Sequence, residues 1–140
     1  MASADKAASH HRVLIVDDDE ATRLLLARIL SSELSVEVQL AGTCEQALHL
    51  SEEYAYDAIL LDLLMPGIGG LEVLKEVRAQ PPNKATPVVI VTVVSDPTTR
   101  EQCMSAGANA YLVKPIERGT LAATVKAQIA GRKRAARAKR

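Results

Sequence analysis

Four runs of four consecutive apolar residues constrain the fold of this 140-residue chain more than any other feature of its sequence. The runs occupy residues 13–16, 58–61, 88–91 and 110–113. Continuous apolar runs of this length are typical of strands buried on both faces, as in a parallel sheet covered by helices. A fifth run, residues 36–40, alternates between apolar and polar side chains, which indicates an edge strand with one wetter face.

Helical segments lie between the runs, and several carry start and stop signals. Asp19, Thr43 and Asp96 are expected to cap three helices, with Thr43 forming a capping box with Gln46. Gly107 is expected to close the helix that Asp96 begins. The side chains expected to face the core are Leu25, Leu26, Ile29 and Leu30 in the first helix, Leu71, Leu74 and Val77 in the third, and Leu121, Val125 and Ile129 in the last.

The strict alternation of strands and helices predicts one α/β domain, a doubly wound parallel sheet with helices on both faces. The chain contains three Tyr and no Phe or Trp, so its core must be aliphatic. Single-stranded nucleic acid is an improbable partner because its bases stack on aromatic rings. We expect a disordered segment over residues 1–10, the domain over residues 11–131 and a basic tail over residues 132–140.

The sequence indicates a soluble cytoplasmic protein with no membrane partner. Cys44 and Cys103 form no CxxC unit, so we expect reduced thiols and neither a disulfide framework nor a zinc site. The first residues lack the apolar core of a signal peptide, and no apolar run is long enough to span a bilayer.

The last nine residues hold six of the 17 basic residues and none of the 17 acidic ones, so the remainder of the chain is acidic. Three interpretations of this tail stay open, of which we favour the first. It is a solvated helix end whose cations suit the helix dipole, an electrostatic contact with an acidic partner or nucleic acid, or a linker to an output domain. No helix-turn-helix segment follows residue 131, so we expect no direct DNA binding.

Polar side chains directly follow the buried runs. Asp17 and Asp18 follow the first run, Asp62 the second, Thr92 the third and Lys114 the fourth. The carboxyl ends of parallel strands line the crevice where ligands bind, so these five side chains are expected to converge in one pocket. A single Asp after a strand is usually a turn former or a helix cap, but five such residues at successive strand ends point to a shared site.

That grouping has a chemical logic. Three carboxylates held together repel one another and call for a divalent cation. Oxygen ligands with room for water favour Mg²⁺. A carboxylate can also attack phosphorus and form an acyl phosphate, and an ammonium and a hydroxyl group can stabilise the transferring phosphoryl oxygens.

The segments that carry these residues resemble the motifs of the response-regulator receiver domain of two-component signalling. They are residues 13–19 (VLIVDDD), 62–67 (DLLMPG), 91–92 (VT) and 111–115 (YLVKP). The resemblance covers roughly residues 11–131 and implies a five-stranded, flavodoxin-like sheet with the strand order 2-1-3-4-5.

The resemblance also implies a role for each matching residue. Asp62 is the phosphoacceptor, Lys114 pairs with the phosphoryl group, Thr92 is the switch hydroxyl, and Tyr111 relays the movement of Thr92. The implied Mg²⁺ ligands are Asp17, Asp18, Asp62 and the backbone carbonyl of Leu64. The bond between Lys114 and Pro115 is cis in many receivers.

The function implied is a phosphorylation-activated signalling switch. It accepts a phosphoryl group from a histidine kinase or a histidine phosphotransfer protein and presents a changed surface to a downstream protein, and a phosphorylation-dependent homodimer stays open. It is not an enzyme beyond its own phosphoryl transfer and autodephosphorylation. The alternative is an aspartyl-phosphate hydrolase, but such enzymes typically carry an acid two residues after the nucleophile, where this chain has Leu64.

One departure from the receiver pattern, and the residues at two flanking positions, bear on the kinetics of phosphorylation and dephosphorylation. Val93 stands where receivers commonly have a small residue. Its branched side chain could narrow the entrance for small phosphodonors or hinder the movement of Thr92. Leu64 and Val94 flank the path of an attacking water in receivers, and neither can hydrogen-bond one. We therefore expect slow autodephosphorylation.

Overall fold

The computed structural model describes residues 11–138, with side chains through Arg132. Five parallel strands form one sheet in the order β2-β1-β3-β4-β5. They are β1 (His11–Val16), β2 (Val36–Ala41), β3 (Ala58–Leu61), β4 (Val88–Thr92) and β5 (Ala110–Val113). The helices are α2 (Glu20–Glu33), α3 (Cys44–Glu53), α4 (Gly70–Ala79), α5 (Pro97–Ser105) and α6 (Arg118–Ala138), with a short 3-10 helix, η1 (Pro81–Asn83). The predicted fold class and strand order are confirmed, while the expectation for residues 1–10 lies outside the described residues.

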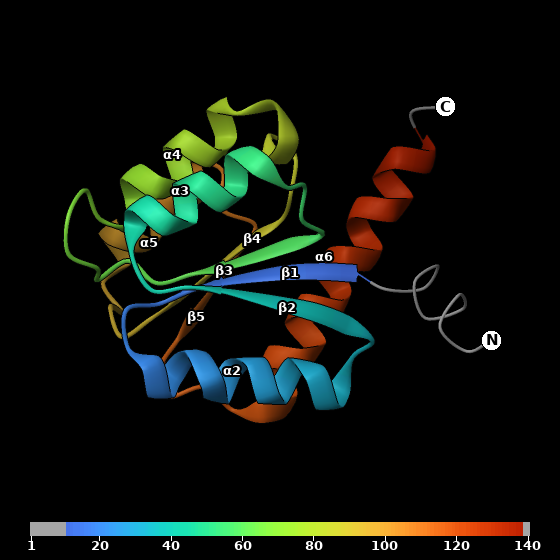
Figure 1. The fold of residues 1–140 in the computed structure, drawn as a ribbon, viewed down its shortest axis with the longest axis horizontal. Helices are drawn as coiled ribbons and strands as arrows, with labels where there is room; N and C mark the ends of the chain where they lie inside the picture. The colour runs from blue at the N-terminus through green and yellow to red at the C-terminus, as the bar shows by residue number, and fades with distance from the viewer. Residues whose placement is uncertain (1–10, 139–140) are drawn as a thin grey trace.

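The helices cover both faces of the sheet. Figure 1 shows α2 and α6 on one face and α3, α4 and α5 on the other. Alternate side chains of each strand serve the two faces, because successive residues of a strand point in opposite directions. In β1, Val13 and Ile15 pack against α2 and α6, whereas Leu14 and Val16 pack on the opposite side. Both cores are mainly aliphatic, as predicted.

Two expectations about burial are wrong. Leu25 is 55 % exposed, whereas Leu26 and its neighbours on the inner stripe are buried. Each helical residue turns the side chain by roughly 100°, so Leu25 lies off the stripe that faces the sheet. β5 is an edge strand and is not buried on both faces: Ala110 and Leu112 are half-buried, and Val113 is 40 % exposed.

The predicted helix caps are present, with one change of partner. The side chains of Asp19 and Asp96 cap α2 and α5. The Thr43 hydroxyl accepts a hydrogen bond from the backbone N–H of Gln46 at 3.0 Å. The Gln46 side chain accepts a bond from Gly42 N at 2.8 Å and not from Thr43 N, so the capping box closes one residue earlier than predicted.

Asn83, at the end of η1, is the centre of a buried hydrogen-bond network. Its side chain is fully buried. Its amide group donates to the backbone carbonyls of Ser51 (2.6 Å) and Tyr54 (2.7 Å). Its oxygen accepts from Tyr56 N at 2.8 Å and from the Thr86 hydroxyl at 3.0 Å. One side chain thus joins the end of α3 to the segments that enter β3 and β4.

Tyr56 lies beside this network and is 1 % exposed. Its hydroxyl donates to Gln39 Oε1 of β2 at 2.5 Å. Burial raises the pKa of Tyr56 to about 12. The other two tyrosines each have an arginine over the ring: Arg12 stands 5.3 Å from the centre of Tyr54, and Arg100 stands 5.6 Å from that of Tyr111.

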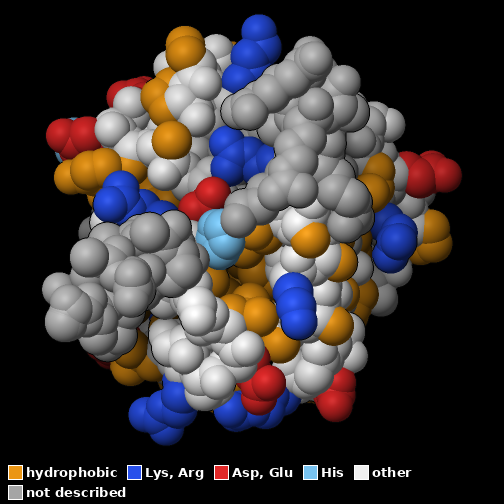
Figure 2. All heavy atoms as spheres, turned by 90° about the vertical axis from the view of Figure 1, so that its right-hand side faces the viewer, with side chains coloured by type: hydrophobic (Ala, Val, Ile, Leu, Met, Phe, Trp, Pro, Cys, Tyr) orange, Lys and Arg blue, Asp and Glu red, His pale blue; other side chains and the backbone are white. Residues whose placement is uncertain are grey.

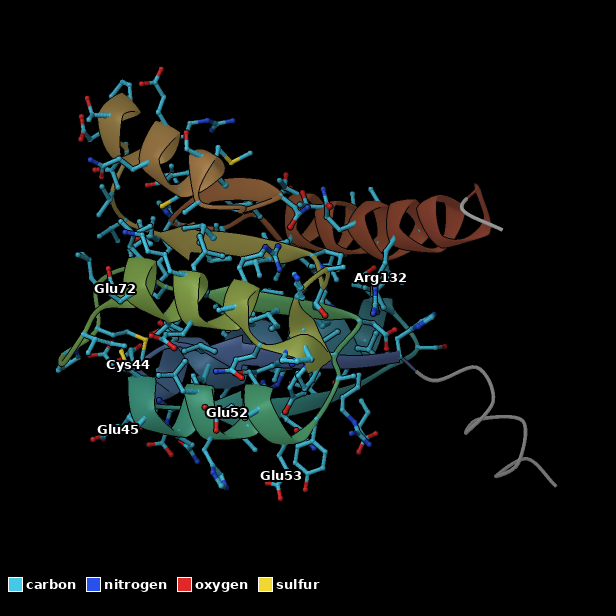
Figure 3. All side chains as sticks on the ribbon, turned by 90° about the horizontal axis from the view of Figure 1, so that it is seen from above. Cys44, Glu45, Glu52, Glu53, Glu72 and Arg132 are labelled. Carbon is cyan, nitrogen blue, oxygen red and sulfur yellow. The ribbon has the colours of Figure 1, made fainter. Side chains whose placement is uncertain are left out.

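α6 crosses one face of the sheet, and Arg132 anchors it at the amino-terminal end. Arg132 of α6, labelled in Figure 3, donates to the Tyr56 carbonyl at 3.1 Å and pairs with Asp57 at 3.3 Å. The helix continues to Ala138, past the boundary expected after residue 131. Figure 2 shows hydrophobic side chains gathered on this end of the molecule, where α6, β1 and β2 border a hollow of about 290 Å³.

Within the described part of the chain, no helix combines the length and the apolar character that crossing a membrane requires.

Candidate functional site

Three carboxylates meet at the carboxyl edge of the sheet, where the loops after β1 and β3 lie side by side. Asp17 is 1 % exposed and Asp62 is 6 % exposed, while Asp18 faces solvent. One oxygen from each of the three carboxylates lies within 4.8 Å of the other two. The register of β1 with β3 explains this approach, because Val16 pairs with Leu61 and each strand is followed directly by its acid.

Lys114 joins two of these acids from the end of β5. Its ammonium nitrogen is 2.8 Å from Asp17 Oδ2 and 3.1 Å from Asp62 Oδ2. Burial alone would lower the pKa of Lys114, but the hydrogen bonds and charges of the two carboxylates outweigh it and raise the pKa. The lysine is therefore charged at neutral pH and lies within hydrogen-bond distance of both carboxylates.

The backbone around Asp62 is shaped by a close approach. Asp62 Oδ1 accepts a hydrogen bond from Leu64 N at 3.2 Å. A Cβ on Gly70 would lie 2.3 Å from the Asp62 carbonyl oxygen and 2.6 Å from Cα of Leu63, so only glycine fits there. The start of α4 can thus press against the loop that carries Asp62.

Thr92 and Tyr111 lie on the neighbouring strands β4 and β5. Thr92 is fully buried, and its hydroxyl accepts a bond from Val94 N at 3.4 Å. Tyr111 is 7 % exposed, and its hydroxyl donates to the Val94 carbonyl at 2.7 Å. Burial raises the pKa of Tyr111. Both polar side chains therefore bind the same short segment after β4, which links their positions.

The donor set suits Mg²⁺. Carboxylate oxygens are the ligands that this ion prefers, and those of Asp17 and Asp62 keep a lone pair beyond their present hydrogen bonds. Both oxygens of Asp18 are open to the ion, because its carboxylate accepts no hydrogen bond from the described residues. Asp17 and Asp62 each share one oxygen with Lys114. Asp17, Asp18 and Asp62 could together hold one ion.

The structure brings the side chains of Asp17, Asp18, Asp62 and Lys114 together. Thr92 adjoins them through its backbone, because its carbonyl accepts a hydrogen bond from Lys114 N at 2.8 Å. The Thr92 hydroxyl makes no hydrogen bond to the three acids or to Lys114 within residues 11–132. Val93 is 57 % exposed and Leu64 is 54 % exposed, so both side chains lie at the surface near the site. The expected cis bond between Lys114 and Pro115 is present.

Arg23 belongs to this region and was not predicted from the sequence. Its guanidinium group reaches back from the first turn of α2 and donates to the Asp17 carbonyl at 2.7 Å. The sequence does not indicate this contact, because the partner of Arg23 is a backbone carbonyl, which every residue of the preceding loop has.

Comparisons with known proteins agree on one family. The model of the response regulator receiver domain matches residues 13–126. The transcriptional regulatory protein ResD of Bacillus subtilis is 36 % identical over 116 residues, which are 83 % of this chain and 47 % of ResD.

Two solved structures extend the likeness to three dimensions. A CheY-like response regulator receiver domain protein of Methanospirillum hungatei matches with a TM-score of 0.84 at 28 % identity, over 90 % of this chain and 98 % of that protein. The receiver domain of the sensor histidine kinase PA1611 of Pseudomonas aeruginosa, with a magnesium ion coordinated in its active site cleft, matches with a TM-score of 0.79 at 30 % identity, over 86 % of this chain and 98 % of that domain. The chain spans less than half the length of the first curated relatives it matches, between 15 % and 47 %.

Proposed function

Because this chain belongs to the response regulator receiver domain family, we propose that it is a phosphorylation-activated switch that carries its phosphoryl group on Asp62. The observation that supports this most is the ion-paired lysine, since Lys114 contacts both Asp17 and Asp62 at the carboxyl edge of the sheet. The ammonium group of Lys114 can offset the negative charge of a phosphoryl group on Asp62, and the neighbouring acids suit a divalent cation that would do the same.

The proposed reaction forms one bond and breaks one. A carboxylate oxygen of Asp62 attacks phosphorus, and the bond from phosphorus to the donor's imidazole nitrogen, or to the acyl oxygen of acetyl phosphate, breaks. The product is an acyl phosphate, and the leaving group takes the electron pair of the broken bond. Lys114 remains charged throughout and stabilises the phosphoryl oxygens. Mg²⁺, bound by Asp17, Asp18, Asp62 and the Leu64 carbonyl, would neutralise further charge on those oxygens.

Incubation with acetyl phosphate and Mg²⁺ tests this function directly. We expect the intact mass to rise by one phosphoryl group, and to return to its starting value as the acyl phosphate hydrolyses. Removing Mg²⁺ with a chelator should suppress the gain. A protein that gained no phosphoryl group at any donor concentration would contradict the proposal.

We expect Asp18→Ala to weaken Mg²⁺ binding by at least about tenfold. The exposed Asp18 carboxylate is free to bind the ion, and losing one charged ligand from a three-acid site removes much of its affinity. The chain has no Trp, so an NMR titration of backbone amides is the suitable measurement. Glu72→Gln, which removes an exposed charge on α4, is the control and should bind as the wild type does. Equal affinity for Asp18→Ala and wild type would remove Asp18 from the ligand set.

A histidine kinase or histidine phosphotransfer protein is the proposed donor. α2 begins directly after the acidic loop, and it exposes Leu24 (50 %) and Leu25 (55 %) beside the site. Adjacent exposed leucines near a reactive group are a surface that a protein donor can cover. A phosphotransfer screen with purified histidine kinases, compared with acetyl phosphate, tests this: transfer from no kinase would leave only the small-molecule reaction.

The proposed output is a change of surface around α5, β5 and α6. A phosphoryl group that draws the Thr92 hydroxyl toward itself would break its bond to Val94 N and disturb the segment that also binds Tyr111. Met104 (39 %) and Val113 (40 %) are exposed apolar residues of this region that a downstream protein or a second copy could cover. Methyl NMR shifts at these two residues on phosphorylation, with sedimentation to detect a homodimer, would test this output.

We expect slow self-dephosphorylation. Leu64 and Val94 offer no side-chain hydrogen bond to an attacking water, and loss of such an orienting group costs about 10²–10⁴-fold in rate. Polar replacements, Leu64→Asn with Val94→Glu, should therefore shorten the phosphoryl lifetime by roughly tenfold or more. The decay is followed by mass after the donor is removed, with Leu64→Met and Val94→Ile as the apolar control. Decay of the wild type within seconds, or equal decay in both variants, would contradict this expectation.

We expect the chain to act on its own phosphoryl group and on no external ester, so p-nitrophenyl phosphate should not be turned over.

The expectation of no direct DNA binding concerns residues 1–140 alone. ResD is a transcriptional regulatory protein of which this chain spans 47 %. The three interpretations of the basic tail stay predictions, because side chains after Arg132 lie outside the described residues.

A further inference from the structure

Arg23 and Gly42 form a small contact unit behind the acidic loop. Arg23 Nη1 donates to the Asp17 carbonyl at 2.7 Å. A Cβ placed on Gly42 would lie 2.8 Å from the same nitrogen and 3.2 Å from Cζ, so the guanidinium group lies over Gly42 where a side chain would otherwise project. Gly42 follows β2 directly, and the Asp17 backbone N–H donates to Ala41 O at 3.1 Å. The loop after β1 is thus held by contacts from both α2 and β2.

The carbonyl that Arg23 binds belongs to the peptide group that joins Asp17 to Asp18. A peptide group is planar, so fixing its oxygen also fixes the direction in which the chain enters Asp18. The Asp17 carboxylate has its own anchors, Asp19 N at 2.9 Å and Lys114. The exposed Asp18 carboxylate has no such partner among the described residues. The orientation of Asp18 therefore depends on its backbone, and Arg23 is the described side chain that binds the carbonyl of the peptide group leading into it.

We propose that Arg23 is a positioning residue for the Mg²⁺ site, an inference that rests on the proposed function. It holds the Asp17–Asp18 peptide so that the Asp18 carboxylate points toward the ion, and Gly42 leaves the space in which it does so. Within residues 11–132, Arg23 forms no ion pair with Asp17, Asp18 or Asp62, so it does not compete with the metal for carboxylate oxygens as Lys114 does.

The direction in which Mg²⁺ affinity changes when Arg23 is removed distinguishes a positioning role from a purely electrostatic one. Arg23 is a cation close to a cation site, so its charge alone opposes Mg²⁺ binding. If charge were its only influence, removing Arg23 would tighten Mg²⁺ binding. If positioning dominates, removing it loosens binding, because losing the partner that orients a ligand typically lowers metal affinity by about 10–100-fold.

The experiment is an NMR titration with Mg²⁺ of the wild type, four single variants and the double variant Arg23→Gln with Gly42→Val. Melting temperatures are measured in the absence of Mg²⁺. Arg23→Gln removes the long donor. Gly42→Val keeps the charge but displaces the guanidinium group, and it fits the backbone because Gly42 does not have a positive φ. Arg23→Lys retains one donor. Arg28→Gln makes the same charge change further along α2, at an exposed residue with no partner among the described ones.

We expect Arg23→Gln and Gly42→Val each to weaken Mg²⁺ binding by about tenfold, with a double variant no worse than either alone. Arg23→Lys should recover most of the affinity, and Arg28→Gln should match the wild type. Equal or tighter binding by Arg23→Gln, or a weakening that Arg28→Gln shares, would overturn the positioning role. A melting temperature that falls in parallel with affinity would reduce Arg23 to a structural residue. If the wild type itself bound no Mg²⁺, the proposed metal site would be wrong. That result differs from one in which the wild type binds Mg²⁺ and only the role of Arg23 is contradicted.

Discussion

Asp62→Asn is expected to abolish phosphorylation completely and to leave the fold intact. An amide has almost the shape of a carboxylate and can still accept the bond from Leu64 N, so the loop should keep its conformation. It is a poor nucleophile toward phosphorus, because its oxygen carries no full charge. Intact-mass measurement after incubation with acetyl phosphate and Mg²⁺ should show one phosphoryl group on the wild type and none on the variant.

Asp57→Asn is the matched control, because it makes the same chemical change at the opposite end of the sheet, where Asp57 pairs with Arg132. It should be phosphorylated as fully as the wild type. Equal labelling of Asp62→Asn would mean that another residue accepts the phosphoryl group. A far-ultraviolet circular dichroism spectrum matching that of the wild type would show that loss of labelling does not come from unfolding.

Asn83→Ala is expected to lower the free energy of unfolding by about 3–5 kcal/mol, a large share of the roughly 5–15 kcal/mol that holds a domain together. The Asn83 side chain is fully buried and makes four hydrogen bonds. Its removal leaves two carbonyls, one N–H and one hydroxyl without this partner, and a buried polar group left unpaired costs about 1–3 kcal/mol. Urea denaturation of both proteins measures the difference.

Two further variants sharpen this prediction. Asn83→Asp keeps both acceptor bonds but cannot donate to Ser51 and Tyr54 when ionised, so it should destabilise the fold more at neutral pH than in mild acid. Gln102→Ala, on the exposed side of α5, should change stability by no more than about 0.5 kcal/mol. A loss below about 1 kcal/mol for Asn83→Ala would show that water replaces the missing partners.

The parts of this molecule that could be predicted from the sequence are those set by local pattern and topology. Apolar runs give strands, and strands that alternate with helices must be parallel, so acids that follow successive strands meet at one edge. That logic is sufficient to predict that Asp17, Asp18, Asp62 and Lys114 lie together. The caps at Asp19 and Asp96 are predictable for a similar reason, because they depend on neighbours only three residues away.

The parts that could not be predicted depend on contacts between distant segments. Arg23 binds a backbone carbonyl, and a carbonyl leaves no trace in the sequence. Asn83 bonds to residues 27 and 32 positions before it, which no short-range pattern encodes. Leu25 is expected on the inner face because leucine usually lies there. The apolar composition of β5 predicts burial on both faces, whereas the strand order that the resemblance implies already places β5 at an edge.

The three tyrosines described above give the chain a simple optical spectrum. With no Phe or Trp, all of its aromatic absorption and fluorescence comes from three phenol rings. The Tyr56 ring is buried beside Gln39, and the Tyr54 ring lies under Arg12 near the surface. The Tyr111 ring lies at the proposed switch. Tyr56 should ionise only in strongly alkaline solution, because burial raises its pKa to about 12. A change of tyrosine emission on phosphorylation would then come chiefly from Tyr111, so the protein would carry its own spectroscopic label at the proposed switch.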